Sequence, residues 1–285
     1  MSAANATGWP GPPATTPGGI GLWPTVRSTR LLLGLLGALI GLAWVSLWIW
    51  KASPYGKYLS HEENAHVTTL GTGYATIVVL FVAGWTLMTV AMMLPTSLPL
   101  VATFSAIVRT RPNRASLVAI LVLGYLAVWT AFAFVAHAGD LGIHKTVDHV
   151  GWLHQNEWVV AAGTFALAGA YQFSSLKYRC LEKCRSPFAF VMQHWHGGRE
   201  RLQTLALGVH HGLFCLGCCW SLMLLMFALG IANLGWMLVL AVVMAAEKNA
   251  PWGRRLSAPL GVALLVVAAV LAGAGLAGHQ LLGGE

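Results

Sequence analysis

Long runs of apolar residues, separated by short polar connections, make up most of the chain. Several runs hold about 20 residues with few or no charges, the length that a helix needs to cross the hydrocarbon core of a membrane. Seven runs are predicted as spanning helices: 31–50, 72–94, 116–137, 158–171 with a few flanking residues, 202–229, 233–246 with its flanks, and 256–277. We therefore expect an all-α fold, a polytopic transmembrane helix bundle.

The polar connections differ in charge. Alternate connections carry 14 of the 17 Lys and Arg residues, whereas Lys51, Lys57 and Lys145 fall on the other side. The positive-inside rule then places the N-terminus in the cytoplasm and the C-terminus outside. Only 9% of the residues are charged, against about a quarter in soluble domains. The basic residues that give the net charge of +8 are thus explained by their position in the cytoplasmic connections. The expected partner is therefore the lipid bilayer, not nucleic acid.

The N-terminal segment 1–26 differs from the rest of the chain in composition. It is rich in Pro, Gly, Ala and Thr and lacks the apolar area that a folded core requires, so we expect a disordered tail at 1–26 and a single transmembrane domain at 27–285. Arg27 and Arg30 precede the first apolar run, and no A-x-A-like cleavage site follows it before Lys51. The run therefore reads as a retained first span.

Candidate chemistry concentrates in the fifth predicted span, which contains His211, Cys215, Cys218, Cys219 and Met226. On an ideal helical wheel these five positions fall within a sector about 100° wide. One stripe of the helix therefore carries imidazole, thiols and a thioether. Such soft ligands select Cu(I), with zinc as the harder competitor. The alternative is that these residues simply fill space in the core.

Two further groups of sulfur ligands lie outside this span. Met88 and Met92 share a helix face just before Pro95 and Pro99, which should kink or break the helix, and they are candidates to complete a Cu(I) site with the fifth span. Cys180 and Cys184 lie one helical turn apart beside basic residues, which favours thiolate. With His194 and His196 they could form a zinc-like site, or they are two thiols near a helix end.

Histidines and charged residues elsewhere allow two interpretations. The expected outer connections contain His61, His66, His144, His149 and His154 near carboxylates, a set that suits a divalent metal or an ordinary solvated loop. Glu247 and Lys248 end the sixth span before Trp252. They could anchor the helix at the membrane interface, or the carboxylate could reach the stripe of the fifth span.

Several motifs resemble a bacterial family of predicted metal-binding integral membrane proteins whose function is largely undefined. The matching residues run in order from Met88 to Gly253: Ala91-Met92-Met93-Leu94-Pro95, Gly124-Tyr125-Leu126 with Trp129, Tyr171-Gln172, Leu176-Lys177, Cys180, Cys184-Arg185-Ser186-Pro187, His211-Gly212-Leu213, Cys215-Leu216-Gly217-Cys218-Cys219-Trp220, Glu247-Lys248 and Pro251-Trp252. Ser174-Ser175 stands where the family pattern would have Thr-Pro. This difference affects only the expectation of a bend in the chain at that point. The resemblance implies metal binding and the inner membrane of a bacterium.

Three functions fit these observations. The first is Cu(I) handling, as a carrier, chaperone or supply protein, without pumping, because the sequence has no Walker motif and no phosphorylated-Asp signature. The second is a non-catalytic accessory subunit of a larger membrane enzyme, such as a copper-dependent oxygenase. The third is an enzyme that uses thiol redox chemistry or a haem on His137, His210 or His211. The sequence favours a protein without catalytic activity of its own.

Overall fold

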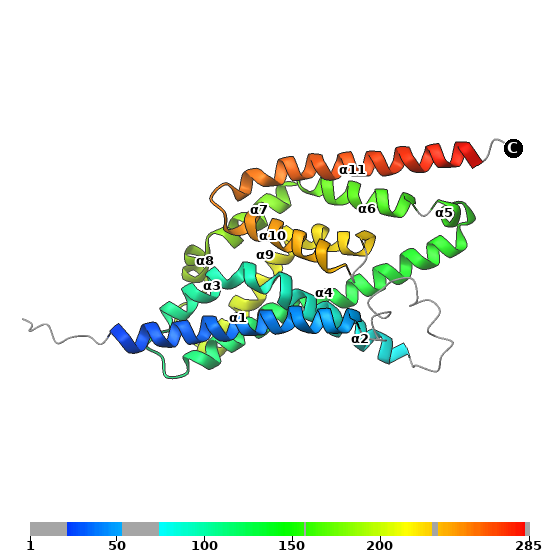
Figure 1. Cartoon of the computed structure of the whole chain (residues 1–285). Helices are drawn as coiled ribbons and strands as arrows, with labels where there is room; N and C mark the ends of the chain where they lie inside the picture. Colours follow the sequence, from blue (N-terminus) through cyan, green and yellow to red (C-terminus); the bar gives the residue numbers. More distant parts are fainter. Residues whose placement is uncertain (1–21, 53–73, 157, 230–232, 283–285) are drawn as a thin grey trace, which may run out of the picture.

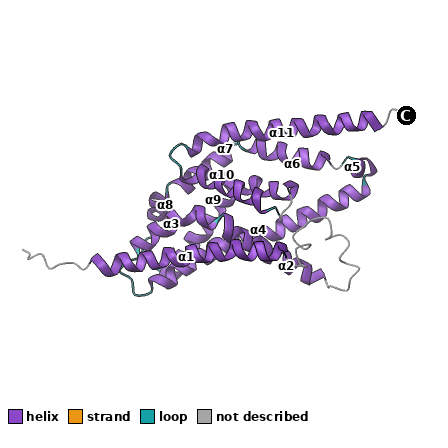
Figure 2. Cartoon of the chain, in the orientation of Figure 1, coloured by secondary structure: helices purple, strands orange, loops and turns teal. Residues whose placement is uncertain are grey.

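The computed structural model describes residues 22–52, 74–156, 158–229 and 233–282, and these form eleven helices. The helices are α1 (Leu22–Ala52), α2 (Tyr74–Met92), α3 (Leu94–Ile107), α4 (Arg114–His149), α5 (Gly151–Gln155), α6 (Trp158–Tyr171), α7 (Ser175–Arg185), α8 (Pro187–His194), α9 (Glu200–Leu229), α10 (Leu234–Asn249) and α11 (Gly253–Leu282). Figure 2 shows these helices joined by short loops, with no strand in the described residues. The all-α prediction is confirmed.

The long helices run side by side as a bundle (Figure 1). One side pairs α6 with α11 and the other places α1 along α2, while α9 and α10 lie between them. Helix α1 begins at Leu22, within the segment expected to be a disordered tail. Residues 1–21 lie outside the described part of the chain, as does the connection 53–73 with His61 and His66.

Four described helices are long and apolar enough to cross a membrane: Leu31–Ala52, Arg114–His149, Glu200–Leu229 and Gly253–Ala277. The number rises to six if each of two bent helix pairs counts as one span. The expected sixth span corresponds to α10, whose 16 residues are short for a crossing. The seven-span topology and the sides of the two termini therefore stay predictions.

Two sharp bends separate consecutive helices, one after α2 and one after α6. Helix α2 ends at Met92 and α3 starts at Leu94 after a bend of 63°, which confirms the break expected at Pro95. Pro99 lies inside α3 and does not end it. Helices α6 and α7 meet at 64°, where the Ser174 hydroxyl accepts a hydrogen bond from the backbone N–H of Lys177 and caps α7.

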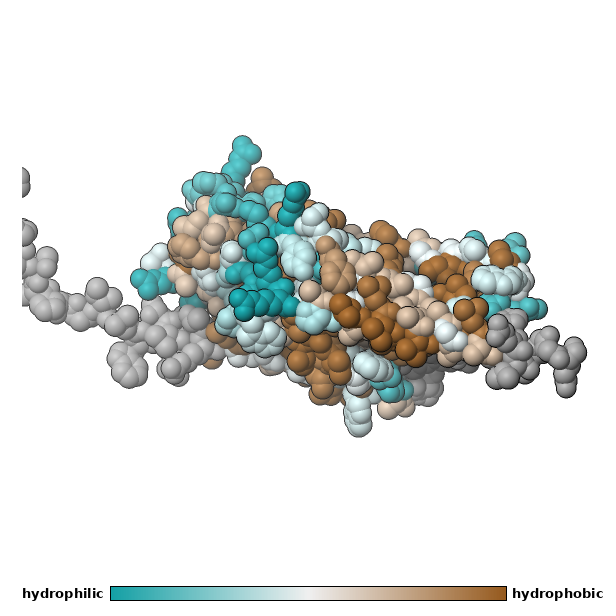
Figure 3. All heavy atoms as spheres, turned by 90° about the horizontal axis from the view of Figure 1, so that it is seen from above, coloured by the Kyte–Doolittle hydropathy of each residue, from teal (hydrophilic) through white to brown (hydrophobic). Residues whose placement is uncertain are grey.

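Polar surface gathers at one end of the bundle. In Figure 3 hydrophilic residues cover that end, and apolar residues cover much of the remaining length. The same end contains the α3–α4 and α8–α9 connections, which carry Arg109 and Arg199, and the α10–α11 connection, which Arg254 follows in the first turn of α11 (Figure 1). The structure thus brings together the basic connections that the sequence assigns to one side.

Close backbone contact between α4 and α9 fixes the centre of the bundle. A Cβ atom at Gly124 would lie 2.7 Å from the Leu205 carbonyl oxygen, and one at Gly212 would lie 2.9 Å from the Val128 side chain. Small residues at these positions let the two helices approach, a packing that is common where helices lie close together in membrane proteins. The approach sets Tyr125 of α4 against the cysteine-bearing face of α9.

Candidate metal centre

Four thiols from two helices form a buried group, called here the sulfur cluster: Cys184 of α7 with Cys215, Cys218 and Cys219 of α9. The three α9 cysteines are at most 1% exposed, and Cys184 is half-buried. The Cys218 Sγ atom lies 3.3 Å from Cys219 Sγ and 3.9 Å from Cys184 Sγ. Cys215 and Cys219 lie one helical turn apart on α9. The two cysteine groups that the sequence treats separately therefore meet at one place.

A glycine allows α7 to lie this close to α9. A Cβ atom at Gly217 would lie 2.6 Å from Cys180 Sγ and 3.4 Å from Cys180 Cβ. The Gly217 carbonyl accepts a 2.5 Å hydrogen bond from the Tyr171 hydroxyl at the end of α6. Cys180, which is 7% exposed, thus packs against the α9 backbone, and Cys184 one turn later reaches the sulfur cluster.

A lysine side chain lies beside the sulfur cluster. The Lys248 Nζ atom, on the last turn of α10, lies 3.0 Å from Cys215 Sγ, 3.0 Å from Thr96 Oγ1 and 3.8 Å from Met93 Sδ. The Lys248 side chain is buried, with 4% exposure. Neither interpretation of the Glu247-Lys248 pair describes this arrangement, because the lysine, and not the carboxylate, reaches the stripe of α9.

The preceding residue, Glu247, enters a separate ion pair. Both of its carboxylate oxygens accept hydrogen bonds of 2.8 Å from the buried Lys177 ammonium, and the Ser257 hydroxyl donates another at 2.7 Å. Lys177 also donates to Gln172 Oε1. The Arg185 guanidinium donates to the backbone carbonyl of Glu247 at 2.6 Å. Glu247 is thereby neutralised by other groups and supplies no counter-charge to Lys248.

The surroundings of Cys215 suit its anionic form. A thiolate is the form of cysteine that binds metal, and a buried ammonium requires a negative charge close by. The Tyr125 hydroxyl lies 3.1 Å from Cys215 Sγ and can donate to a thiolate there. Among the contacts of Lys248 described above, the Cys215 thiol is the group that can become an anion. Sequence reasoning missed Lys248 and Tyr125 as parts of this centre, whereas it expected Met93 to assist the cysteines of the fifth span.

The candidate methionines lie in the same core but at different heights. Met88, Met92 and Met226 are each at most 1% exposed. Met226 follows Cys219 by two helical turns, which is about 10 Å along the helix axis. The backbone of Met226 is therefore distant from an ion held at Cys219, and Met93 is the methionine whose sulfur contacts Lys248 at the centre.

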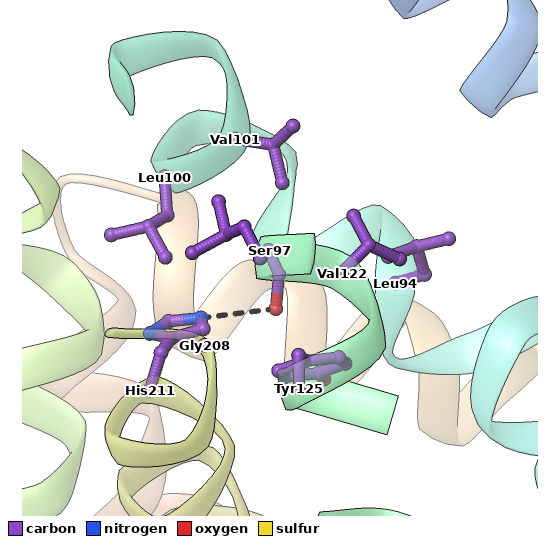
Figure 4. A pocket seen from close by; sticks show the side chains of 9 residues that line it. Leu94, Ser97, Leu100, Val101, Val122, Tyr125, Gly208 and His211 are labelled. Carbon is purple, nitrogen blue, oxygen red and sulfur yellow. Dashed lines mark hydrogen bonds between the residues drawn. The ribbon is translucent and has the colours of Figure 1, made fainter. Parts of the chain in front are cut away.

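The contacts described for His211 are with groups outside the sulfur cluster. Its Nε2 atom lies 3.2 Å from the Ser97 hydroxyl, and its ring packs against Tyr125 and Phe190 with centroid separations of 5.6 and 5.8 Å. Figure 4 shows His211, Ser97 and Tyr125 around a cavity of about 10 Å³, which is close to the size of one water molecule. His194 also lies elsewhere, since its ring contacts Phe190 and His210.

Residues 82–271 match the model of the PpoB2 family, which is described as a copper chaperone family. The chain belongs to this family. No curated protein and no solved structure matches the chain. The matched residues include the whole sulfur cluster, Lys248 and Tyr125, and the match confirms at the family level the expected link to copper.

The sulfur cluster of this PpoB2 family member fits a soft ion in part. Two sulfurs that share one ion at about 2.3 Å lie about 3.8–4.0 Å apart. The separation of 3.9 Å between Cys184 and Cys218 meets this condition, whereas the 3.3 Å between Cys218 and Cys219 must open slightly. In the described residues no group of three or more His, Cys, Asp and Glu side chains is arranged to hold a metal. Pairs of thiols and the Met93 thioether are thus the donors that the structure offers.

Proposed function

We propose that the protein is an integral membrane protein that binds Cu(I) as cargo in the sulfur cluster and supplies it to another protein. The observation that carries this proposal is the contact of Cys184 with Cys218, which in turn contacts Cys219, inside a chain of a copper chaperone family. Thiolate and thioether sulfur are the ligands that select Cu(I) among biological metals.

Lys248 supports the proposal through charge. A Cu(I) ion held by two thiolates has one net negative charge, which is costly in a buried site unless a cation balances it. The Lys248 ammonium, 3.0 Å from Cys215 Sγ, supplies that balance. The Met93 thioether lies beside the same ammonium, with its sulfur 3.8 Å from Lys248 Nζ. The other candidates are proposed as surrounding residues that shape the core: Cys180, His211, Met88, Met92 and Met226.

A membrane location is part of the proposal. Four to six helices are apolar and long enough to span, and their outward residues are apolar, for example Leu35 at 68% exposure and Val270 at 64%. A lipid environment explains such exposed side chains. The basic connections at one end support an inner-membrane protein with that end in the cytoplasm.

The test is anaerobic Cu(I) binding by the full chain in detergent, measured by competition with a coloured Cu(I) chelator. Cys184→Ser and Cys218→Ser should each lower the affinity, because each removes one of the two sulfurs placed to share an ion. Met192→Leu, which changes a methionine 44% exposed on α8, is the control and should bind as wild type does. Equal affinity in all four proteins would refute the proposal.

The accessory-subunit function is the alternative. It predicts that the chain co-purifies with other membrane chains in fixed proportion and that its loss removes their activity even when copper is added to them directly. A supply protein instead becomes dispensable when copper is added.

A further inference from the structure

A second group of metal ligands lies on the surface between α8 and α9. The His194 ring, at the end of α8, and the His210 ring, on α9, have centroids 5.1 Å apart at an interplanar angle of 48°. His194 is half-buried and His210 is exposed. These two residues, the histidine pair, take no part in the contacts of the sulfur cluster.

The hydrogen bond of His194 leaves one ring nitrogen for a ligand. Its Nδ1 atom lies 2.9 Å from the Phe190 carbonyl oxygen. A carbonyl accepts and does not donate, so Nδ1 carries the proton, and in the neutral ring Nε2 has its lone pair available. Metal-binding histidines in proteins are commonly oriented in this way by a carbonyl on the other nitrogen.

The separation of the two rings is that of imidazoles on one four-coordinate ion. A nitrogen about 2.1 Å from the metal places the ring centroid about 3.2 Å from it, so two rings at a tetrahedral angle lie about 5.2 Å apart. The observed 5.1 Å agrees with this value. A linear two-coordinate ion would need about 6.4 Å by the same construction.

We propose that the histidine pair binds a borderline divalent ion, Zn(II) or Cu(II), with water in the remaining positions. Imidazole suits these ions, whereas the thiols of the sulfur cluster suit Cu(I). The polar segment 195–199 follows His194 directly, and this places the pair near the hydrophilic end of the bundle, within reach of water. The site is separate from the sulfur cluster and does not rest on the proposed Cu(I) function.

Co(II) is the probe, because its visible absorption distinguishes nitrogen and oxygen ligands from thiolates. The full chain in detergent, without oxygen, should lose one equivalent of Co(II) with nitrogen–oxygen character in His210→Ala and in His194→Gln. His196→Ala changes a neighbouring exposed histidine outside the pair and should keep that equivalent.

Since His210 is exposed, His210→Ala tests the site even if His194→Gln fails to fold. Unchanged Co(II) binding in His210→Ala, or a lost equivalent with thiolate absorption, would overturn the inference. Cys218→Ser should keep the Co(II) equivalent of the histidine pair. The Co(II) result for the histidine pair is therefore independent of whether the sulfur cluster binds Cu(I).

Discussion

Gly217→Ala should weaken Cu(I) binding without removing a single donor atom. The new Cβ would lie 2.6 Å from Cys180 Sγ, which is too close, and 3.4 Å from Cys180 Cβ, at the lower edge of ordinary contact. Cys180 is buried with little room for its thiol to rotate, so we expect α7 to give way by about 1 Å to restore an ordinary packing distance to the sulfur. Cys184, one turn further along α7, moves with it.

The size of the effect follows from the sulfur positions. Two sulfurs bound to one ion at about 2.3 Å cannot be more than about 4.6 Å apart. Cys184 and Cys218 are 3.9 Å apart, and a shift of about 1 Å would exceed that limit. Binding then requires α7 to move back against the added methyl group. Overpacking of this kind costs about 1–3 kcal/mol, which corresponds to a loss of about 5–150-fold in affinity.

Competition with a Cu(I) chelator measures this loss, with Gly163→Ala as the matched control because a Cβ there meets no atom within 4 Å. Adding Cys180→Ala removes the sulfur that clashes, so the double variant Gly217→Ala/Cys180→Ala should recover most of the affinity. Two results would refute the reasoning: wild-type affinity in Gly217→Ala, or no recovery in the double variant. In the second case Cys180 would itself be a ligand.

Three other predictions follow from the charges and the burial. Lys248→Met removes the cation beside the thiolate. Because a charged hydrogen bond contributes about 1.5–3 kcal/mol, the same assay should show about 10–150-fold weaker Cu(I) binding. Unchanged binding would contradict this role of Lys248. Lys177→Met leaves Glu247 buried without its cation, which should cost about 3–5 kcal/mol of stability in thermal unfolding, and Lys177→Met/Glu247→Leu should be more stable than that single variant. A maleimide should modify the half-buried Cys184 before Cys219, which is 1% exposed. Mass spectrometry measures the two rates of modification, and equal rates would argue against the packing of α7 on α9.

The fold was largely predictable because apolar length and proline position are local properties. The runs 31–50, 116–137 and 256–277 lie within α1, α4 and α11, and the break before Pro95 was expected from the missing backbone donor. The bend between α6 and α7 was less accessible, since Ser175 stands where a proline would signal it, and Ser174 instead caps α7. The shortness of α10 was hidden by the apolar composition around it, because the sequence does not show that Asn233 and Ala250 are its caps.

The cysteines of the site were predictable from the sequence, whereas the residues that contact them were not. A helical wheel gives the direction of a side chain but ignores its height, so Met226 shares an angle with Cys215 although three helical turns, about 16 Å of rise, separate them. The wheel also omits neighbouring helices: Ser97 of α3 forms a hydrogen bond with His211, and α7 brings Cys184 to Cys218. Only tertiary packing supplies these facts.

Glu247 and Lys248 are adjacent in the sequence, but their side chains contact different helices. Consecutive residues point about 100° apart on a helix, so opposite charges at the end of α10 face different neighbours. Glu247 meets Lys177 of α7 and Ser257 of α11, while Lys248 meets Thr96 of α3 and Cys215 of α9. A buried ammonium that contacts a thiol, a hydroxyl and a thioether is costly unless one of them becomes an anion. The position of Lys248 is therefore itself an argument that a thiolate forms at Cys215, the charge state in which cysteine binds a metal ion.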